Sequence, residues 1–216
     1  MKKDFTDITV VLDRSGSMGS VRDDTIGGFN TFIGEQKKIE GKCNLTLVQF
    51  DTEYEFVHKG QNITKVASLD HSTFVPRGMT ALLDAVGRAI VETGQRLAEM
   101  NEDDRPNKVI FVIQTDGAEN ASKEYNRAKV MEMIKLQQDK YNWEFIFLGA
   151  NQDAISTGAS MGIKGGKSLS YASNTVGTEN VYRSVNKIVS NIRSGKGPTD
   201  FEDSDRDEQS KAGAKS

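Results

Sequence analysis

The sequence is poor in cysteine, the residue that cross-links a fold through disulfides. It contains one cysteine, Cys43, among 216 residues, so no disulfide can form within the chain. A chain without disulfides is typical of a reducing compartment, and we expect a cytoplasmic protein. At 216 residues, the chain is long enough for one full α/β domain. A domain of this size buries enough surface to fold without a metal or a disulfide.

The sequence also lacks a large excess of charge of either sign and has no long apolar run. The 28 basic and 31 acidic residues give a net charge of −3, so the sequence lacks the strongly basic character of nucleic-acid binders and predicts no nucleic-acid partner. No run approaches the roughly 20 apolar residues that cross a membrane. The early apolar run at residues 8–12 is too short for a signal-peptide core, so we expect no membrane association.

Short apolar runs rich in β-branched residues alternate with amphipathic stretches, which is the pattern of βα units around a parallel sheet. The expected parallel strands are residues 8–13, 44–50, 108–116 and 143–150. Residues 54–58 follow the second strand after too few residues for a parallel crossover. This fifth strand is therefore predicted to pair antiparallel at the sheet edge.

Helical periodicity fills the segments between the strands. Ile26, Phe29 and Ile33 share one helical face, and the same spacing recurs in residues 83–90. Further helices are expected at about residues 123–139 and 178–193. The sequence thus predicts an α/β, Rossmann-like domain over residues 1–195, with a mostly parallel sheet and helices on both faces. Residues 196–216 are polar and acidic, and we expect a disordered tail.

Oxygen-bearing side chains follow the first expected strand. Asp13, Ser15 and Ser17 occupy alternate positions of a tight loop, where they can converge on one point. Ligands of open parallel sheets bind beyond the carboxyl ends of the strands. Hydroxyl and carboxylate oxygens suit a hard divalent cation such as Mg²⁺, with Mn²⁺ or Ca²⁺ as alternatives, and no His or Cys lies nearby to favour zinc.

A second carboxylate, Asp116, is expected at the same sheet edge, because it ends the strand at residues 108–116. Two close carboxylates raise each other's pKa unless a cation lies between them. Thr80 lies near the start of the helix that contains residues 83–90, and its hydroxyl either faces this cation or caps the helix.

Three residues near these positions have interpretations other than metal binding. Asp51 is expected to serve turn chemistry, and Asp84 to be a structural helix carboxylate. Arg14 is either an exposed loop residue without a fixed role or a contact to a ligand.

Together, these segments resemble the metal-ion-dependent adhesion site (MIDAS) of von Willebrand factor A (VWA) domains. The resemblance covers about residues 5–195, and residues 147–154 are similar to those of stand-alone bacterial and phage members. The matching residues, in type, order and strand context, are Asp13-x-Ser15-x-Ser17, Thr80 within Gly-x-Thr-Ala-Leu, and Thr115-Asp116-Gly117.

The resemblance implies a VWA fold and a metal-binding role for this pentad. By analogy, Ser15, Ser17 and Thr80 coordinate the ion directly or after rearrangement, and Asp13 and Asp116 act through water. A cation held by neutral hydroxyls keeps much of its charge, so we expect it to bind an Asp or Glu of a partner protein.

This binding role is expected to be non-catalytic, and two alternatives stay open. A Mg-dependent phosphohydrolase would also place an aspartate at Asp13, although such enzymes have a second aspartate where Ser15 stands. The other alternative is a structural interaction domain without metal. His58 and His71 have no acidic or cysteine neighbours at ligand spacing and are expected to be surface residues.

Overall fold

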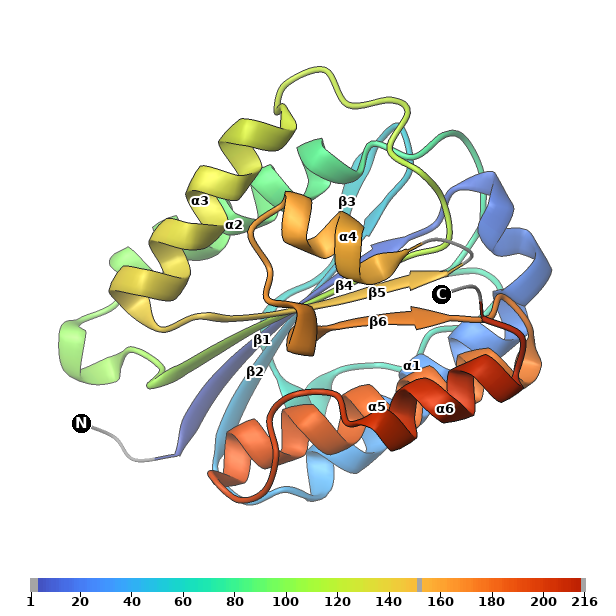
Figure 1. The fold of residues 1–216 in the computed structure, drawn as a ribbon. Helices are drawn as coiled ribbons and strands as arrows, with labels where there is room; N and C mark the ends of the chain where they lie inside the picture. The colour runs from blue at the N-terminus through green and yellow to red at the C-terminus, as the bar shows by residue number, and fades with distance from the viewer. Residues whose placement is uncertain (1–3, 151–152, 215–216) are drawn as a thin grey trace.

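A six-stranded sheet forms the centre of the computed structural model, which describes residues 4–150 and 153–214 (Figure 1). Its strands are β1 (Phe5–Asp13), β2 (Lys42–Phe50), β3 (Tyr54–Asn62), β4 (Lys108–Thr115), β5 (Glu144–Ala150) and β6 (Ser168–Tyr171). Their order is β3-β2-β1-β4-β5-β6; β3 runs antiparallel to β2, and the other neighbouring pairs are parallel. The predicted mostly parallel sheet with one antiparallel edge strand is confirmed.

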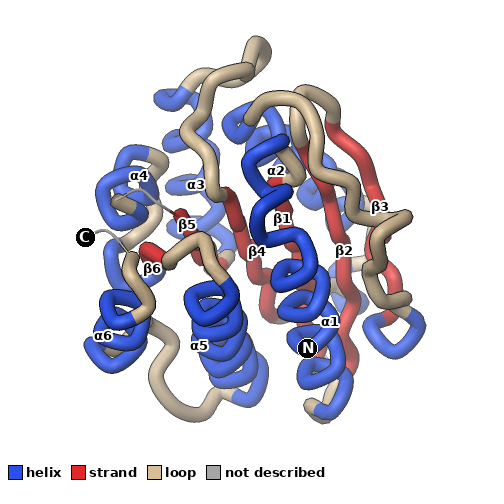
Figure 2. Tube along the Cα trace, turned by 90° about the vertical axis from the view of Figure 1, so that its right-hand side faces the viewer, coloured by secondary structure: helices blue, strands red, loops and turns tan. Residues whose placement is uncertain are grey.

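Helices cover both faces of the sheet, as predicted. Figure 1 shows α2 and α3 above the sheet and α1, α5 and α6 below it, and Figure 2 shows the same layers from the side. The helices are α1 (Arg22–Lys38), α2 (Leu82–Ala98), α3 (Arg127–Tyr141), α4 (Ala154–Ser160), α5 (Thr175–Ser194) and α6 (Asp203–Lys211), with short 3₁₀ turns at η1 (Gly16–Val21), η2 (Ile63–Lys65), η3 (Glu102–Asp104) and η4 (Gly165–Lys167).

Each face has its own apolar core. Phe29 of α1 and Val185 of α5 pack in one cluster against the sheet, and Val86 of α2 and Val130 of α3 pack in the other. The strand side chains are buried on both sides, which explains why β1 and β4 read as continuous apolar runs. Within the described residues, no helix has the length and apolar character needed to span a bilayer.

Besides α6 in the C-terminal segment, the short elements β6 and α4 were missed, and α3 begins later than predicted. β6 has only four residues and α4 only seven, too short for a periodic pattern to identify them. α3 begins at Arg127 and not at residue 123, because the Asn126 side chain accepts a hydrogen bond from Lys129 N and caps the helix. Residues 151–152 of the segment similar to bacterial and phage proteins lie outside the described residues.

The C-terminal segment departs from the expected disorder. Residues 196–214 contain α6, and Phe201 is buried with 6% of its surface exposed. Phe201 N donates to Gly166 O at 2.8 Å, Asp205 accepts from Ser184 Oγ at 2.8 Å, and Gln209 Nε2 donates to Gly177 O at 3.0 Å. The buried Phe201 and the polar side chains that bond to α5 thus order this segment, although its composition predicts disorder.

Replacing this anchor tests the order of the segment. We expect Phe201→Ala to lower the free energy of unfolding by roughly 3 kcal/mol, because it leaves a cavity against the sheet. Urea denaturation measures the change, with Asp207→Ala on the exposed side of α6 as the control. A loss below about 0.5 kcal/mol, as expected for a surface substitution, would show that the segment does not pack.

Candidate metal centre

The carboxyl end of β1 gathers the first three residues of the predicted site. Asp13 is the last residue of the strand and is fully buried. Its Oδ1 accepts a hydrogen bond from Ser15 N at 2.6 Å, and Ser15 Oγ lies 3.1 Å from Ser17 Oγ. Ser15 is buried and Ser17 is exposed, so the three residues lead from the core to the surface.

Asp116 joins this group from the neighbouring strand. β4 pairs in parallel with β1, so Thr115 and Asp116 emerge beside Asp13. Ser17 Oγ donates to Asp116 Oδ1 at 2.6 Å, and Thr115 Oγ1 donates to Asp13 Oδ2 at 2.5 Å. The structure therefore brings Asp13, Ser15, Ser17 and Asp116 into one hydrogen-bonded group.

Both carboxyl groups are shifted towards protonation. Burial raises the pKa of Asp13 to about 6, and the negative charge of Asp116 acts in the same direction. Hydrogen bonds from Thr115 and Ser15 oppose this shift without cancelling it. Burial also raises the pKa of Asp116, against the hydrogen bond from Ser17. Within the described residues, no positive charge therefore compensates the ionised forms of the two groups.

Thr80 lies against the same group from the segment before α2. It is buried, and a Cβ added at Gly117 would lie 2.8 Å from Thr80 Oγ1 and 3.6 Å from Ser17 Oγ. A glycine at position 117 therefore allows the two loops to approach. The alternative role of Thr80 as a helix cap is wrong, because the N-cap position of α2 is Ala81 and Glu119 accepts a hydrogen bond from Leu83 N.

An ion-pair cluster that includes Arg14, in the loop after β1, was not found from the sequence. Arg14 is 5% exposed, and its Nε donates to Asp51 Oδ2 at 3.0 Å; Arg77 Nε donates to the same oxygen at 3.0 Å. Burial acts to raise the pKa of Asp51, but a hydrogen bond from Glu53 N and the two guanidinium groups hold it below its ordinary value. Asp51 forms the expected turn bond and also ties two loops together.

Asp84 is structural, in agreement with its sequence interpretation. Its carboxylate accepts hydrogen bonds from the backbone N–H groups of Lys123, Glu124 and Tyr125, at 2.8 to 2.9 Å. In return, Glu119 Oε2 accepts from Leu83 N at 2.8 Å. These reciprocal bonds fix the loop after β4 to the start of α2, and thereby fix Thr80 relative to Asp116.

Comparison with known proteins identifies the fold. No protein-family model and no curated protein matches the sequence. The solved structure of a von Willebrand factor type A protein from Catenulispora acidiphila superposes with a TM-score of 0.53 at 13% identity, over 85% of this chain and 42% of that chain. The present chain has the VWA fold.

Other solved structures with this similarity include proteins of very different origin. Proximal thread matrix protein 1 from the mussel byssus, described with a zinc-occupied MIDAS motif, has a TM-score of 0.59 at 16% identity over 87% of this chain and 46% of that chain. The pilus adhesin SpaC of Lactobacillus rhamnosus GG has a TM-score of 0.61 at 14% identity over 89% and 31%. This chain spans less than half the length of each of these chains.

The donor set of this VWA domain fits a divalent cation. Two carboxylates with raised pKa values lie beside three hydroxyl groups, all hard oxygen donors. Within the described residues, no group of three or more His, Cys, Asp or Glu side chains is placed to hold a metal. A cation at this edge would thus depend on hydroxyl groups as well as carboxylates.

Removing the charge of Asp13 tests the electrostatic strain at this site. Asp13 has a folded pKa of about 6 and an unfolded value of 3.8, so its favourable contribution is present below about pH 4 and is lost as pH rises through 6. We therefore expect metal-free Asp13→Asn to be more stable than the wild type at about pH 7, by about 1–3 kcal/mol.

The geometry of Asp13→Asn should be preserved. The amide oxygen can accept from Ser15 N, and Thr115 Oγ1 has a second acceptor in Gly117 O at 3.1 Å. Urea denaturation with a chelator at about pH 4 and pH 7 measures the difference, and Asp103→Asn in exposed η3 is the control. If Asp13→Asn were destabilised equally at both pH values, the charge of Asp13 would not be what destabilises the metal-free protein.

Proposed function

We propose that this chain is a metal-dependent protein-binding domain that captures an acidic residue of a partner. One observation carries the proposal: two carboxylates with raised pKa values are joined by serine hydroxyls at the carboxyl edge of the sheet. In this proposal, the metal ligands, direct or through water, are Asp13, Ser15, Ser17, Thr80 and Asp116.

The exposure of the group supports a role in binding. Ser17 is exposed and Asp116 is half-buried, whereas Asp13 and Ser15 are buried. A cation held here would therefore have protein on one side and solvent on the other. Neutral hydroxyl ligands leave positive charge on the cation, so a partner's Asp or Glu can replace water in the open position.

Mg²⁺ is the proposed ion, with Mn²⁺ or Ca²⁺ as substitutes. Mg²⁺ prefers oxygen ligands and retains several waters, which matches a site with few direct protein ligands. The zinc described for the mussel protein shows that a MIDAS motif there accepts another divalent ion. We also propose a cytoplasmic location, because the single cysteine is a free, buried thiol.

Binding is favoured over phosphate-ester hydrolysis. A hydrolytic mechanism through Asp13 would use a second acidic group as general acid, but Ser15 stands where such enzymes have their second aspartate. Ser15 N donates to Asp13 Oδ1 at 2.6 Å, and Ser15 Oγ lies 3.1 Å from Ser17 Oγ. Neither histidine is placed as a general base for Asp13 or Ser15. His71 is exposed and its Nε2 lies 3.2 Å from Asp23 Oδ1, and His58 lies on the edge strand β3.

Partner capture under defined metal conditions tests the proposal. Immobilised protein is incubated with extract of its native host in the presence of Mg²⁺ or of a chelator. We expect the wild type to retain partners with Mg²⁺ and to lose them with chelator. Asp116→Ala should fail to retain the same partners even with Mg²⁺, because the partner's carboxylate binds the ion and not the protein. Asp139→Ala, an exposed position on α3, is the matched control and should retain them.

Two outcomes would favour the other functions. An unchanged set of partners in chelator would contradict metal-dependent binding and support a structural interaction domain. Mg-dependent hydrolysis of a generic phosphate ester that disappears in Asp13→Asn would instead support the phosphohydrolase.

A further inference from the structure

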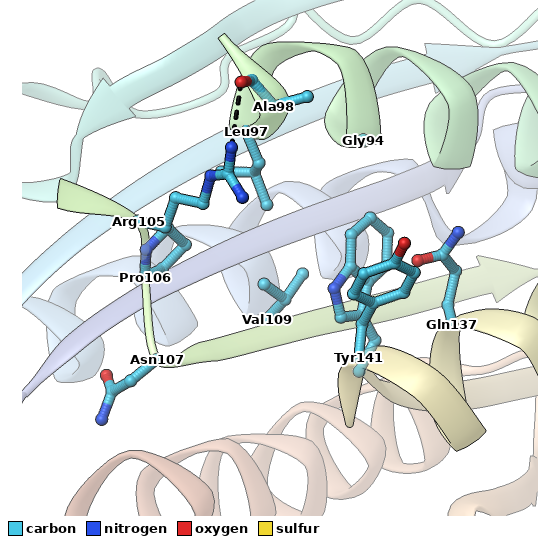
Figure 3. A pocket seen from close by; sticks show the side chains of 10 residues that line it. Gly94, Leu97, Ala98, Arg105, Pro106, Asn107, Val109, Gln137 and Tyr141 are labelled. Carbon is cyan, nitrogen blue, oxygen red and sulfur yellow. Dashed lines mark hydrogen bonds between the residues drawn. The ribbon is translucent and has the colours of Figure 1, made fainter. Parts of the chain in front are cut away.

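A cavity of about 300 Å³ opens at the amino-terminal edge of the strands, at the end of the sheet opposite the candidate metal centre (Figure 3). It lies between the last turns of α2 and α3 and the first residues of β4. The volume is at the lower end of the range for small-molecule sites, and it matches a ligand of one or two rings.

Apolar and aromatic groups form most of its lining. Leu97 of α2 and Val109 of β4 are buried, and Trp143 is 7% exposed. The Trp143 ring stacks on Phe111 with a centroid distance of 5.4 Å and an interplanar angle of 13°, which fixes its orientation. Tyr141 is 53% exposed and adds a second ring. Flat aromatic walls favour a planar ligand that can stack on them.

Arg105 is the one charged residue among those that line the cavity. Its Nη2 donates to Ala98 O at 3.1 Å and its Nε to Met100 O at 3.2 Å, so the C-terminal end of α2 holds the guanidinium in place. A guanidinium has five N–H donors, and these two bonds leave others for a ligand. Figure 3 shows Arg105 on one side of the cavity and Tyr141 and Gln137 across from it.

The charge of the lining selects against cations. Glu102, Asp103 and Asp104 precede Arg105 in η3, but none of them lines the cavity. Two carbonyl groups in the last turns of α3, those of Gln137 and Gln138, already accept hydrogen bonds from Asn142 N and Trp143 N. An anionic group beside Arg105 would therefore gain a charge-assisted bidentate contact.

We propose that this cavity binds a small planar aromatic carboxylate. The carboxylate pairs with Arg105, and the ring packs between Tyr141, Trp143 and Leu97. The site is separate from the candidate metal centre and does not depend on the proposed partner binding. For a ligand of about ten non-hydrogen atoms, we expect a Kd on the order of 0.1 mM.

Trp143 is the only tryptophan of the chain, so its fluorescence reports on the cavity directly. The probe is phenylacetate, compared with 2-phenylethanol, phenethylamine and acetate. We expect a saturable change in Trp143 emission with phenylacetate, and about five- to tenfold weaker binding for the neutral alcohol and for the amine. Acetate, which has no ring, should give no change.

Two variants separate the site from general effects on folding. Gly94 lines the cavity, and a Cβ added there meets nothing within 4 Å, so Gly94→Leu should fill the cavity without a clash and abolish the response. Gly34→Leu, an equally open helical glycine on α1, is the matched control and should bind normally. Arg105→Gln should weaken phenylacetate binding about five- to tenfold and leave binding of 2-phenylethanol unchanged.

The proposal is overturned by any of three results. These are no saturable response of the wild type to phenylacetate, normal binding by Gly94→Leu, or phenethylamine binding as tightly as phenylacetate. Asp116→Ala should bind phenylacetate as the wild type does, so a failure of the metal proposal and a failure of this one are distinguishable.

Discussion

Two carboxylates leave neighbouring parallel strands at one edge of the sheet, and the cost of burying their charge is the constraint on which the rest of this structure depends. The pairing of β1 with β4 brings Asp13 and Asp116 together, and burial raises the pKa of both. Serine hydroxyls link them but supply no positive charge. The protein therefore maintains an arrangement that is unfavourable for folding alone, and a bound divalent cation would relieve it.

The loops around the carboxylates are held by bonds that do not involve the site itself. Arg14 and Arg77 share Asp51, and Asp84 accepts three backbone hydrogen bonds from the loop after β4. These contacts fix the loops before any ligand is bound, which lowers the entropic cost of binding. Arg14 is thus a structural residue within the loop after β1, and neither of its two sequence interpretations, an exposed loop residue or a contact to a ligand, included this role.

Patterns that are local in sequence predicted the fold well. The apolar runs of β1 and β4 and the spacing of Ile26, Phe29 and Ile33 gave the layers, and the alternate polar positions after β1 pointed to the site. Features that depend on distant partners were missed. Arg14 pairs with a residue 37 positions away, and the order of α6 depends on Phe201 reaching the region of η4 and β6. Composition alone cannot show that a polar segment has such partners.

In the proposed function, a cation binds between the hydroxyl and carboxylate groups at the carboxyl edge of the sheet. Crystals soaked with Mn²⁺ and measured near the manganese absorption edge test it directly, because anomalous scattering locates the ion without reference to its ligands. We expect one strong peak about 2.2 Å from the hydroxyl oxygens of Ser15 and Ser17. The absence of a peak there, with the hydrogen bond between Ser17 and Asp116 intact, would contradict it.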